Sequence, residues 1–318
     1  MCNADSKALL VLPHLRIQNA NAISSPLTWG FPAMSAFIGF MHALERRLPD
    51  SLELYFNAIG VICHDYETQV QSGYVNTFHL TRNPVGKDGK TAAIVEEGRM
   101  HLEVTLVLGV DGKSIHDADV AQAVMDTAAS MRVAGGSVIP PLPGRRNYRP
   151  ELKVLGDDLG DKQETFRQLK RRWLPGFALV LRDDLLKEHH QERQQIQPDT
   201  TLLESWLDLS RLNWECLQTT TEDDNGKETI EVEWRVRKKP GWLVPLPIGY
   251  GALTKVFKPG EVANARDDST PFCFVESLYS VGQWRSPHHL ESPRDLLWYV
   301  DNNLDRDLYR LNNDYQAH

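Results

Sequence analysis

The 318-residue sequence predicts an α+β protein, and three observations lead to this prediction. Segments in which apolar and polar residues alternate indicate strands, whereas apolar residues at spacings of three and four indicate helices. In the first 140 residues these patterns follow the order strand, helix, strand, strand, helix, strand. In the second half helical patterns precede strand-like segments that Pro and Gly interrupt.

The first strand is predicted at residues 7–17, with one apolar face made of Leu9, Val11, Leu15 and Ile17. The other face becomes polar towards its end, where Arg16 follows His14. Pro13 removes a hydrogen bond of the strand ladder, so we expect a bulge or a bend there. Residues 18–31 are small, polar and rich in amides, and we expect them to form a loop.

A buried helix is predicted directly after this loop. Pro32 suits the first turn of a helix, and apolar residues then recur at every third or fourth position. These residues are Met34, Phe37, Ile38, Met41, Leu44 and Leu48. The helix would offer free backbone N–H groups at its start, beside the polar loop.

Two more strands are predicted at residues 53–63 and 100–110, where apolar residues dominate or alternate. A second helix begins after Asp117, and its apolar positions are Val120, Val124, Ala128 and Met131. It is expected to stop at the pair Gly135-Gly136, before a short strand at residues 137–139. This order is typical of ferredoxin-like folds and of the RNA recognition motif.

The domain organisation follows from the segments between these elements. Residues 65–99 are polar, basic and rich in turns, so we expect an inserted, thumb-like arm. The Pro- and Gly-rich stretch PPLPGRRNYRP indicates a boundary. We therefore expect a ferredoxin-like or RRM-type domain at residues 1–145 and a mixed α/β region at residues 146–318. In that region we predict helices at 163–174, 183–195 and 200–214, and strands in EVEWRVRKKPGWLVPLP and PFCFVESLYSVGQW.

Composition is typical of a globular protein in a reducing compartment. The chain is 41% hydrophobic and 25% charged, and no apolar run approaches the roughly 20 residues of a membrane span. The N-terminus lacks the basic region and apolar core of a signal peptide. The cysteines, Cys2, Cys63, Cys216 and Cys273, have no disulfide-framework spacing. We therefore expect a cytoplasmic protein without a membrane partner.

The net charge of −8 argues weakly against a nucleic-acid-binding protein. Several short segments are nevertheless basic and can hold a phosphate backbone locally. They contain Arg145, Arg146 and Arg149, then Arg167, Lys170, Arg171 and Arg172, and then Arg235, Arg237, Lys238 and Lys239. Solvated surface is the alternative for each of them.

No motif for catalysis, a metal or an organic cofactor is present, and we expect neither a metal nor a cofactor. GKDGKT ends like a phosphate-binding loop but lacks its first glycine, and a strand is expected after it. The pairs His189-His190 and His288-His289 are adjacent in sequence, so their rings diverge instead of converging on one metal. His14 is a candidate acid–base group for a ribonuclease, although a single surface histidine is more often not catalytic.

Several long strings resemble, in the same order, the second Csy subunit of type I-F CRISPR surveillance complexes. This family contains the Cas five-type, handle-binding members of the repeat-associated RAMP proteins. The resemblance covers nearly the whole chain. The strings are LLVLPHLRIQNANAISSPLTWGFPAMSAFIGFMHALERR, FHLTRNPVGKDGKTAAIVEEGRMHLEVTLVLGV, MRVAGGSVIP, RRWLPGFALV, KPGWLVPLPIGY, PGEVANARD and SPHHLESPRDLLWY.

The resemblance implies a non-catalytic, RNA-binding role in antiviral defence. Members of the family hold the 5′ handle of the CRISPR RNA together with the large Csy subunit, and they abut the first backbone Csy subunit of the guide filament. The complex then finds target DNA by base pairing. Anti-CRISPR proteins are further candidate partners. A RAMP-type endoribonuclease that cleaves the CRISPR repeat is the alternative function, and a pure scaffold for the large subunit is a third.

The chemistry of single-stranded RNA recognition then selects candidate contact residues. Amide and hydroxyl side chains suit base edges, arginine and lysine suit phosphates, and an indole suits stacking. We predict RNA contacts from Arg16, Asn19, Asn21, Ser24, Ser25, Trp29, Arg82, Asn83, Arg99, Arg132, Gly135, Gly136, Ser137, Arg237 and Lys239.

Each group of candidates has a structural alternative. The asparagines can brace the loop through Asx turns, and Trp29 can fill the core beneath it. The glycine pair can be a helix C-cap. Arg237 and Lys239 can bind phosphate or meet an acidic face of the large subunit.

Overall fold

The structure is a computed structural model of the chain. It describes residues 5–82, 85–86, 88–141, 148–156, 158–222, 228–265, 267–303 and 307–316. The chain divides into two compact units. Unit 1 comprises residues 1–181, 246–279 and 285–318, and unit 2 comprises residues 182–245 and 280–284. The predicted domain boundary at residues 145 and 146 lies outside the described residues.

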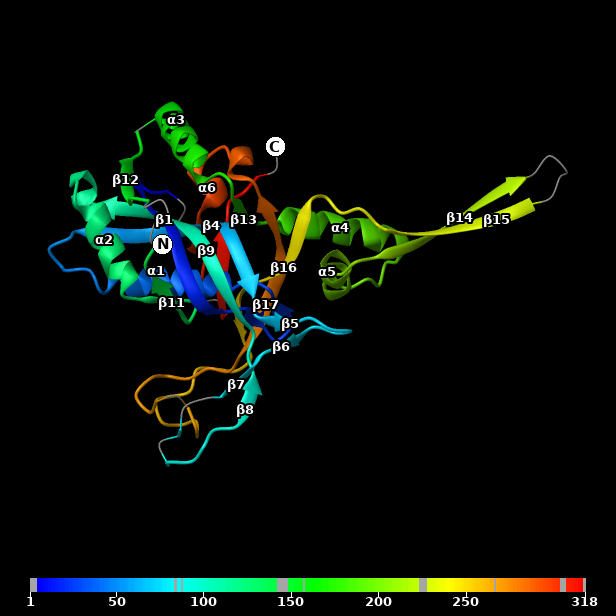
Figure 1. Cartoon of the computed structure of the whole chain (residues 1–318), viewed down its shortest axis with the longest axis horizontal. Helices are drawn as coiled ribbons and strands as arrows, with labels where there is room; N and C mark the ends of the chain where they lie inside the picture. Colours follow the sequence, from blue (N-terminus) through cyan, green and yellow to red (C-terminus); the bar gives the residue numbers. More distant parts are fainter. Residues whose placement is uncertain are drawn as a thin grey trace. The chain divides into compact units, whose positions relative to one another are not determined.

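The main sheet has eleven strands and its strands pair mainly antiparallel, so the α+β prediction is confirmed (Figure 1). Its order is β10 (Arg132–Val133), β11 (Gly136–Ile139), β1 (Ala8–Asn21), β9 (Arg99–Gly112), β4 (Leu54–Thr68), β13 (Phe177–Leu181), β17 (Val275–Arg285), β16 (Trp242–Ala252), β19 (Leu308–Asn313) and β18 (Trp298–Val300). The eleventh strand, β12 (Glu151–Val154), pairs with β1.

Helices cover this sheet because its strands are apolar on both faces. Leu9 and Val11 share a buried cluster with Phe166 of α3 (Leu159–Lys170) and with Trp173, which follows that helix. Leu10, on the opposite face of β1, is also fully buried. The helices α1 (Met34–Glu45) and α2 (Val120–Ala129) contact β4 and β1 respectively, and a short α6 (Pro293–Leu296) contacts β13 and β4.

The start of β1 and the bulge at Pro13 follow the sequence prediction. The register between β1 and β9 shifts between Leu12 and Leu15, and His14 has a φ of 48°. The prediction of a loop at residues 18–31 is wrong in part, because β1 continues to Asn21. A small hairpin of β2 (Ile23–Ser25) and β3 (Thr28–Trp29) follows it.

Two short ladders lie between β4 and β9 in the chain. One joins β5 (Val70–Gln71) to β6 (Thr77–Phe78), and the other joins β7 (Leu80–Arg82) to β8 (Ile94–Glu96). In the described part of the chain, no helix combines the length and the apolar character that crossing a membrane requires.

Unit 2 contains α4 (Asp183–Ile196), α5 (Leu202–Ser210) and a ribbon of β14 (Trp214–Glu222) and β15 (Glu228–Val236). The prediction of a helix at residues 200–214 is wrong at its end, because α5 stops at Ser210 and β14 begins at Trp214. A capping box starts α5: the Thr201 hydroxyl accepts from the Glu204 N–H, and the Glu204 carboxylate accepts from the Thr201 N–H.

Candidate nucleic-acid-binding site

A cavity of about 570 Å³ opens at the N-terminus of α1 in unit 1. Its lining comes from the end of β1, the β2–β3 hairpin, the first turn of α1, the β10–β11 turn, β16 and β19. The lining residues are Asn21, Ile23, Ser24, Pro32, Ala33, Ser35, Ala36, Ala134, Tyr250 and Tyr309. The fold therefore brings together three segments that the sequence predicted to bind RNA, and it adds two tyrosines.

The first turn of α1 supplies polar groups to this cavity. Ala33, the residue before the helix, is extended and provides no side-chain cap. The first N–H groups of a helix lack the usual partner one turn earlier, and its N-terminus carries partial positive charge. In α1 the Ala36 N–H donates to the Ala33 carbonyl at 2.9 Å. An anionic group is therefore favoured where Ala33, Ser35 and Ala36 line the cavity.

The β10–β11 hairpin supplies a tight turn on the other side. Ala134 and Gly135 both have positive φ, 48° and 79°, as a two-residue hairpin turn requires. The Asn21 N–H donates to the Ala134 carbonyl at 2.9 Å, which fixes the turn against the end of β1. Because α2 ends at Ala129 with Ser130 as its C-cap, the helix C-cap alternative for the glycine pair is wrong.

The other predicted RNA-contact residues of this hairpin are Gly136, Ser137 and Arg132. Gly136 is buried, and a Cβ atom there would come within 2.8 Å of the Ala20 backbone, so only glycine fits at this contact with β1. Ser137 is exposed and pairs with Gln18 of β1 and with Arg132 of β10. Arg132 is also exposed.

Asn21 and the two serines are engaged in local hydrogen bonds. The Asn21 amide donates to the Ile23 carbonyl at 2.7 Å and accepts from the Ile23 N–H at 3.1 Å, which is an Asx turn. The hydroxyls of Ser24 and Ser25 bond to the hydroxyl of Thr28 at 2.7 and 2.6 Å. These contacts close the hairpin, so the bracing alternative describes Asn21 in the structure.

Asn19 and Arg99 lie together, near the end of β1 and at the start of β9. The Asn19 side-chain oxygen accepts from Gln69 at 2.6 Å, and Arg99 donates to the Asn19 carbonyl at 3.5 Å. Arg99 also forms an ion pair with Glu97 at 2.9 Å. Arg16 lines a second cavity of about 300 Å³, whose other lining side chains include the carboxylates of Asp65, Glu67 and Glu103.

Trp29 lies on the hairpin with half of its surface exposed. Its ring meets Phe78 edge-on, with the ring centroids 5.3 Å apart. The core-filling alternative for Trp29 is therefore wrong, and one face can stack a base. In the predicted arm, Arg82 ends β7, whereas Asn83 and Lys87 lie outside the described residues, as do Arg145 and Arg146 after β11.

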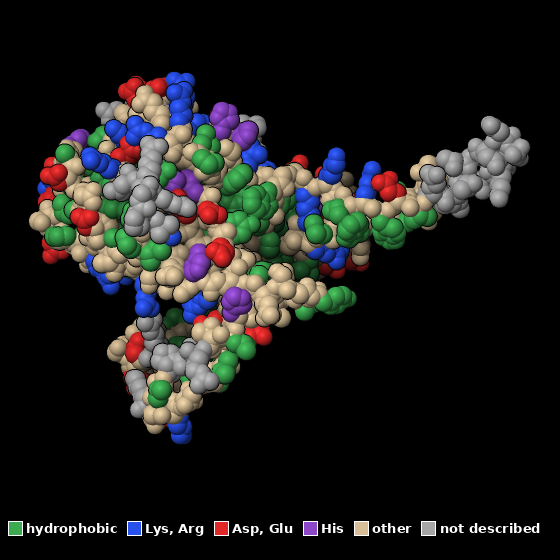
Figure 2. Space-filling model, in the orientation of Figure 1, with side chains coloured by type: hydrophobic (Ala, Val, Ile, Leu, Met, Phe, Trp, Pro, Cys, Tyr) green, Lys and Arg blue, Asp and Glu red, His purple; other side chains and the backbone are tan. Residues whose placement is uncertain are grey.

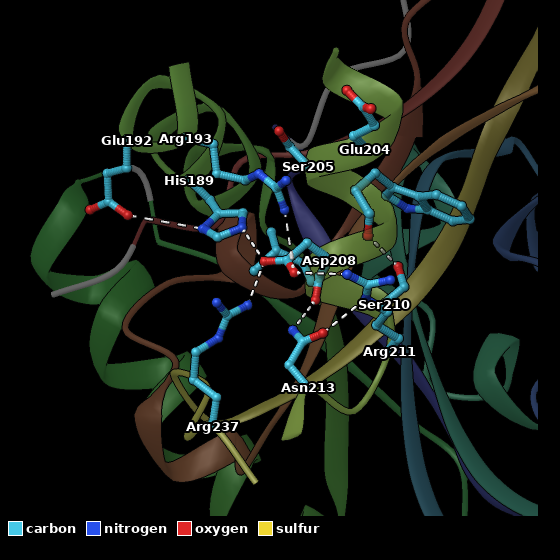
Figure 3. Close-up of polar contacts among 12 residues, drawn as sticks. His189, Glu192, Arg193, Glu204, Ser205, Asp208, Ser210, Arg211, Asn213 and Arg237 are labelled. Carbon is cyan, nitrogen blue, oxygen red and sulfur yellow. Dashed lines mark hydrogen bonds and ion pairs between the residues drawn. The ribbon is translucent and has the colours of Figure 1, made fainter. Parts of the chain in front are cut away.

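Arg237 and Lys239 belong to unit 2 and contact residues at the end of α5. Figure 3 shows the Arg237 side chain pointing toward Asp208. Arg237 donates to the Asp208 carboxylate at 2.5 Å. The Lys239 ammonium donates to the carbonyl of Leu209 at 2.6 Å and to that of Arg211, at the C-terminal end of the helix. Both side chains thus hold unit 2 together, and their contact with RNA stays a prediction.

Asp208 is the centre of this cluster and is only 5% exposed. His189 bonds to its carboxylate at 2.8 Å, and the guanidinium groups of Arg193 and Arg211 lie within 3.3 and 3.6 Å. Burial alone would raise the pKa of Asp208, but hydrogen bonds from Arg237 and His189 outweigh it and keep the pKa below its usual value.

Sequence reasoning missed Tyr250 and Tyr309 as site residues. They are cross-strand partners in β16 and β19, and their ring centroids are 6.2 Å apart. The only local signal is Gly249, whose φ is 152° and whose Cβ would overlap the Tyr309 carbonyl. A glycine inside a strand indicates a close backbone approach but not its partner.

His14, the candidate acid–base group, is stacked between two rings. His64 lies on one face with centroids 4.0 Å apart, and Tyr148 lies on the other at 3.7 Å. The His14 Nδ1 atom is 2.7 Å from the Glu103 carboxylate. Glu103 therefore orients the ring, and both ring faces are covered.

Below pH 6.5 the stability of unit 1 is expected to fall because of His64. Burial lowers its pKa, so the unfolded chain binds a proton at a higher pH than the folded chain does. The neutral ring suits its partners: Nδ1–H donates to the Pro175 carbonyl, and Nε2 accepts from the Thr105 hydroxyl, each at 2.7 Å. Urea unfolding between pH 5 and 7.5 measures this loss. The His64→Gln variant should show a flatter pH profile, and an unchanged profile would contradict the assignment.

Comparisons with known proteins show the family of this chain. A family model described as "CRISPR-associated protein (Cas_Csy2)" matches residues 10–311. The protein named "CRISPR-associated protein Csy2" from Pseudomonas aeruginosa (strain UCBPP-PA14) is 47% identical over 322 residues. That match covers 98% of this chain and 96% of the relative. The chain therefore belongs to the Csy2 family of CRISPR-associated proteins.

Proposed function

We propose that this chain is a non-catalytic, RNA-binding subunit of a type I-F CRISPR surveillance complex in the cytoplasm. It holds the 5′ handle of the CRISPR RNA together with the large Csy subunit and caps the guide filament formed by the backbone Csy subunit. Target DNA reaches it only through the complex. The observation that carries this proposal is the cavity at the start of α1, where a helix N-terminus and two tyrosine rings face one space.

The topology of the sheet supports an RNA-binding domain at residues 1–145. The strand order β11–β1–β9–β4 has α1 between β1 and β4 in the chain, and α2 between β9 and β11. This order supports a ferredoxin-like fold of the RAMP type, in which we expect the glycine-rich turn to approach RNA. The thumb-like arm expected at residues 65–99 then corresponds to the segment between the end of β4 at Thr68 and the start of β9 at Arg99.

The chemistry of the cavity fits single-stranded RNA. A phosphate suits the start of α1, where Ser35 adds a hydroxyl group. Tyr250 is 38% exposed, so its ring can receive an unstacked base. Exposed Arg132 and the half-exposed indole of Trp29 lie on the neighbouring hairpins and extend the contact surface.

The purified chain with its large partner is expected to bind handle RNA in a salt-dependent way. Changing Arg82 and Arg132 to alanine should weaken binding and reduce the slope of log K against log salt by about 0.7 for each phosphate that is no longer neutralised. Arg46→Ala with Arg47→Ala, at the opposite end of α1, removes the same charge and should leave binding unchanged. If the Arg82/Arg132 variant and the Arg46/Arg47 variant bind handle RNA with equal affinity, the assignment of Arg82 and Arg132 to the RNA-binding site is refuted.

The competing function is a RAMP-type repeat endoribonuclease, and the bond between His14 and Glu103 is the observation that favours it. Incubation with labelled repeat RNA and EDTA separates the two functions. The binding proposal expects intact RNA. Specific cleavage that His14→Ala abolishes would establish the enzyme instead.

A further inference from the structure

The β14–β15 ribbon of unit 2 is amphipathic. In its register Trp214 pairs with Val236, Cys216 with Trp234 and Gln218 with Val232. Directly paired residues lie on the same face of a ladder, and alternate pairs return to that face. One face therefore carries Trp214, Cys216, Val232, Trp234 and Val236, which we call the indole face.

The indole face is uncovered. Trp214 and Trp234 are each 61% exposed, and Val232 is 55% exposed. Among the described strands, β14 and β15 pair only with each other. Figure 2 shows hydrophobic side chains at the surface of this ribbon. A two-stranded ribbon gains little stability from its own pairing, so an apolar face of this kind indicates that a second surface covers it.

The opposite face of the ribbon is charged, and this charge indicates which kind of partner the ribbon can bind. It carries Glu215, Glu233 and Arg235 beside Leu217. Residues 214–236 contain seven Asp and Glu residues but only two basic ones, Lys227 and Arg235. RNA would be repelled by this charge, since base-stacking platforms lie in positively charged grooves. Two copies of the ribbon would repel each other for the same reason.

We propose that the indole face docks into an apolar groove, rimmed by lysine and arginine side chains, on another protein subunit of the CRISPR complex. The two indoles are the anchors, because buried tryptophans carry much of the binding energy of protein interfaces. The carboxylates of the opposite face meet the basic rim. This inference rests on the proposed function, in that it requires the complex to assemble.

Cys216 reports whether the indole face is covered, because it lies opposite Trp234 at the centre of that face and is exposed. The experiment alkylates the free chain, and then the complex co-purified with its other Csy subunits and CRISPR RNA, using iodoacetamide. Peptide mass spectrometry follows each thiol. Cys63 is the unreactive control, because burial raises the pKa of its thiol to about 12.

Cys216 is expected to react readily in the free chain and at least about tenfold more slowly in the complex, because a docked face excludes the reagent. An equal rate in the two states would overturn the proposal. Protection that instead grows with the concentration of the free chain would also overturn it, since self-association would then cover the face.

A paired set of variants tests the anchors. Trp214→Thr with Trp234→Thr should lower the amount of partner subunit that co-purifies with the chain, whereas Leu217→Thr, which removes an apolar side chain from the opposite face, should not. Handle RNA binding by the unaltered chain with its large partner is measured alongside. If that binding is absent, the proposed function is refuted, whereas normal binding with undiminished co-purification of the Trp variant would refute only the docking site.

Discussion

Changing Asp208 to alanine is expected to destabilise unit 2 by about 3–5 kcal/mol, the usual cost of removing one partner of a buried ion pair. The carboxylate is 5% exposed and is the common acceptor of Arg237 and His189. Arg193 of α4 also lies 3.3 Å from it. Without Asp208 the guanidinium groups of Arg237 and Arg193 would have no counter-charge between them.

Hydrogen exchange of peptides from α4 and α5 measures this effect locally. Exchange of both helices should accelerate in Asp208→Ala, and to a smaller extent in Asp208→Asn, which keeps hydrogen-bonding groups but loses the charge. Arg211→Ala is the matched control. Its side chain is 68% exposed, so its ion pair with Asp208 is worth at most about 1 kcal/mol. Unaltered exchange in Asp208→Ala would mean that apolar contacts alone hold α5.

The same cluster explains why the end of α5 could not be predicted from the sequence. Leu209 and Leu212 continue the helical spacing, so periodicity alone does not mark the end of the helix. The Asn213 amide donates to the Asp208 carbonyl at 2.8 Å, and Lys239 bonds to the carbonyls of Leu209 and Arg211 from 30 and 28 residues away. A hydrogen bond between residues so far apart in the chain produces no pattern within a short window of sequence.

The core of unit 1 could be predicted because periodicity and burial coincide there. Met34, Phe37, Ile38, Met41 and Leu44 are all fully buried, as the spacing of the helix required. The bulge at Pro13 followed from the missing N–H of proline.

The polar stretch after β1 gave a weaker prediction. Its small residues indicated a loop, but hydroxyl bonds among Ser24, Ser25 and Thr28 fold it into a hairpin. The candidate site was predicted only in part for a related reason. Asn21 and the glycine turn were found from local chemistry, whereas Tyr250 and Tyr309 reach the cavity through pairing between β16 and β19.

Removing both tyrosine rings is expected to give the largest loss of RNA affinity. Stacking of a base on an aromatic side chain is worth about 1–3 kcal/mol, so Tyr250→Ala with Tyr309→Ala should weaken handle binding about 5- to 150-fold for each base that stacks. Fluorescence anisotropy with labelled handle RNA at fixed salt measures the change. Replacing both tyrosines by phenylalanine keeps the rings and should preserve most of the affinity.

Tyr55→Ala is the matched control for that experiment. Tyr55 is 58% exposed and pairs with Asp111, at the opposite end of β9 from the Arg99–Asn21 pair beside the cavity. If the double alanine variant binds handle RNA with the same affinity as Tyr55→Ala, the cavity does not hold a base. If the double phenylalanine variant loses as much affinity for handle RNA as the double alanine variant, the hydroxyl groups bind RNA by hydrogen bonds and the rings do not stack on it. The three variants thus separate stacking, hydrogen bonding and a site elsewhere, because each mechanism predicts a different order of affinities.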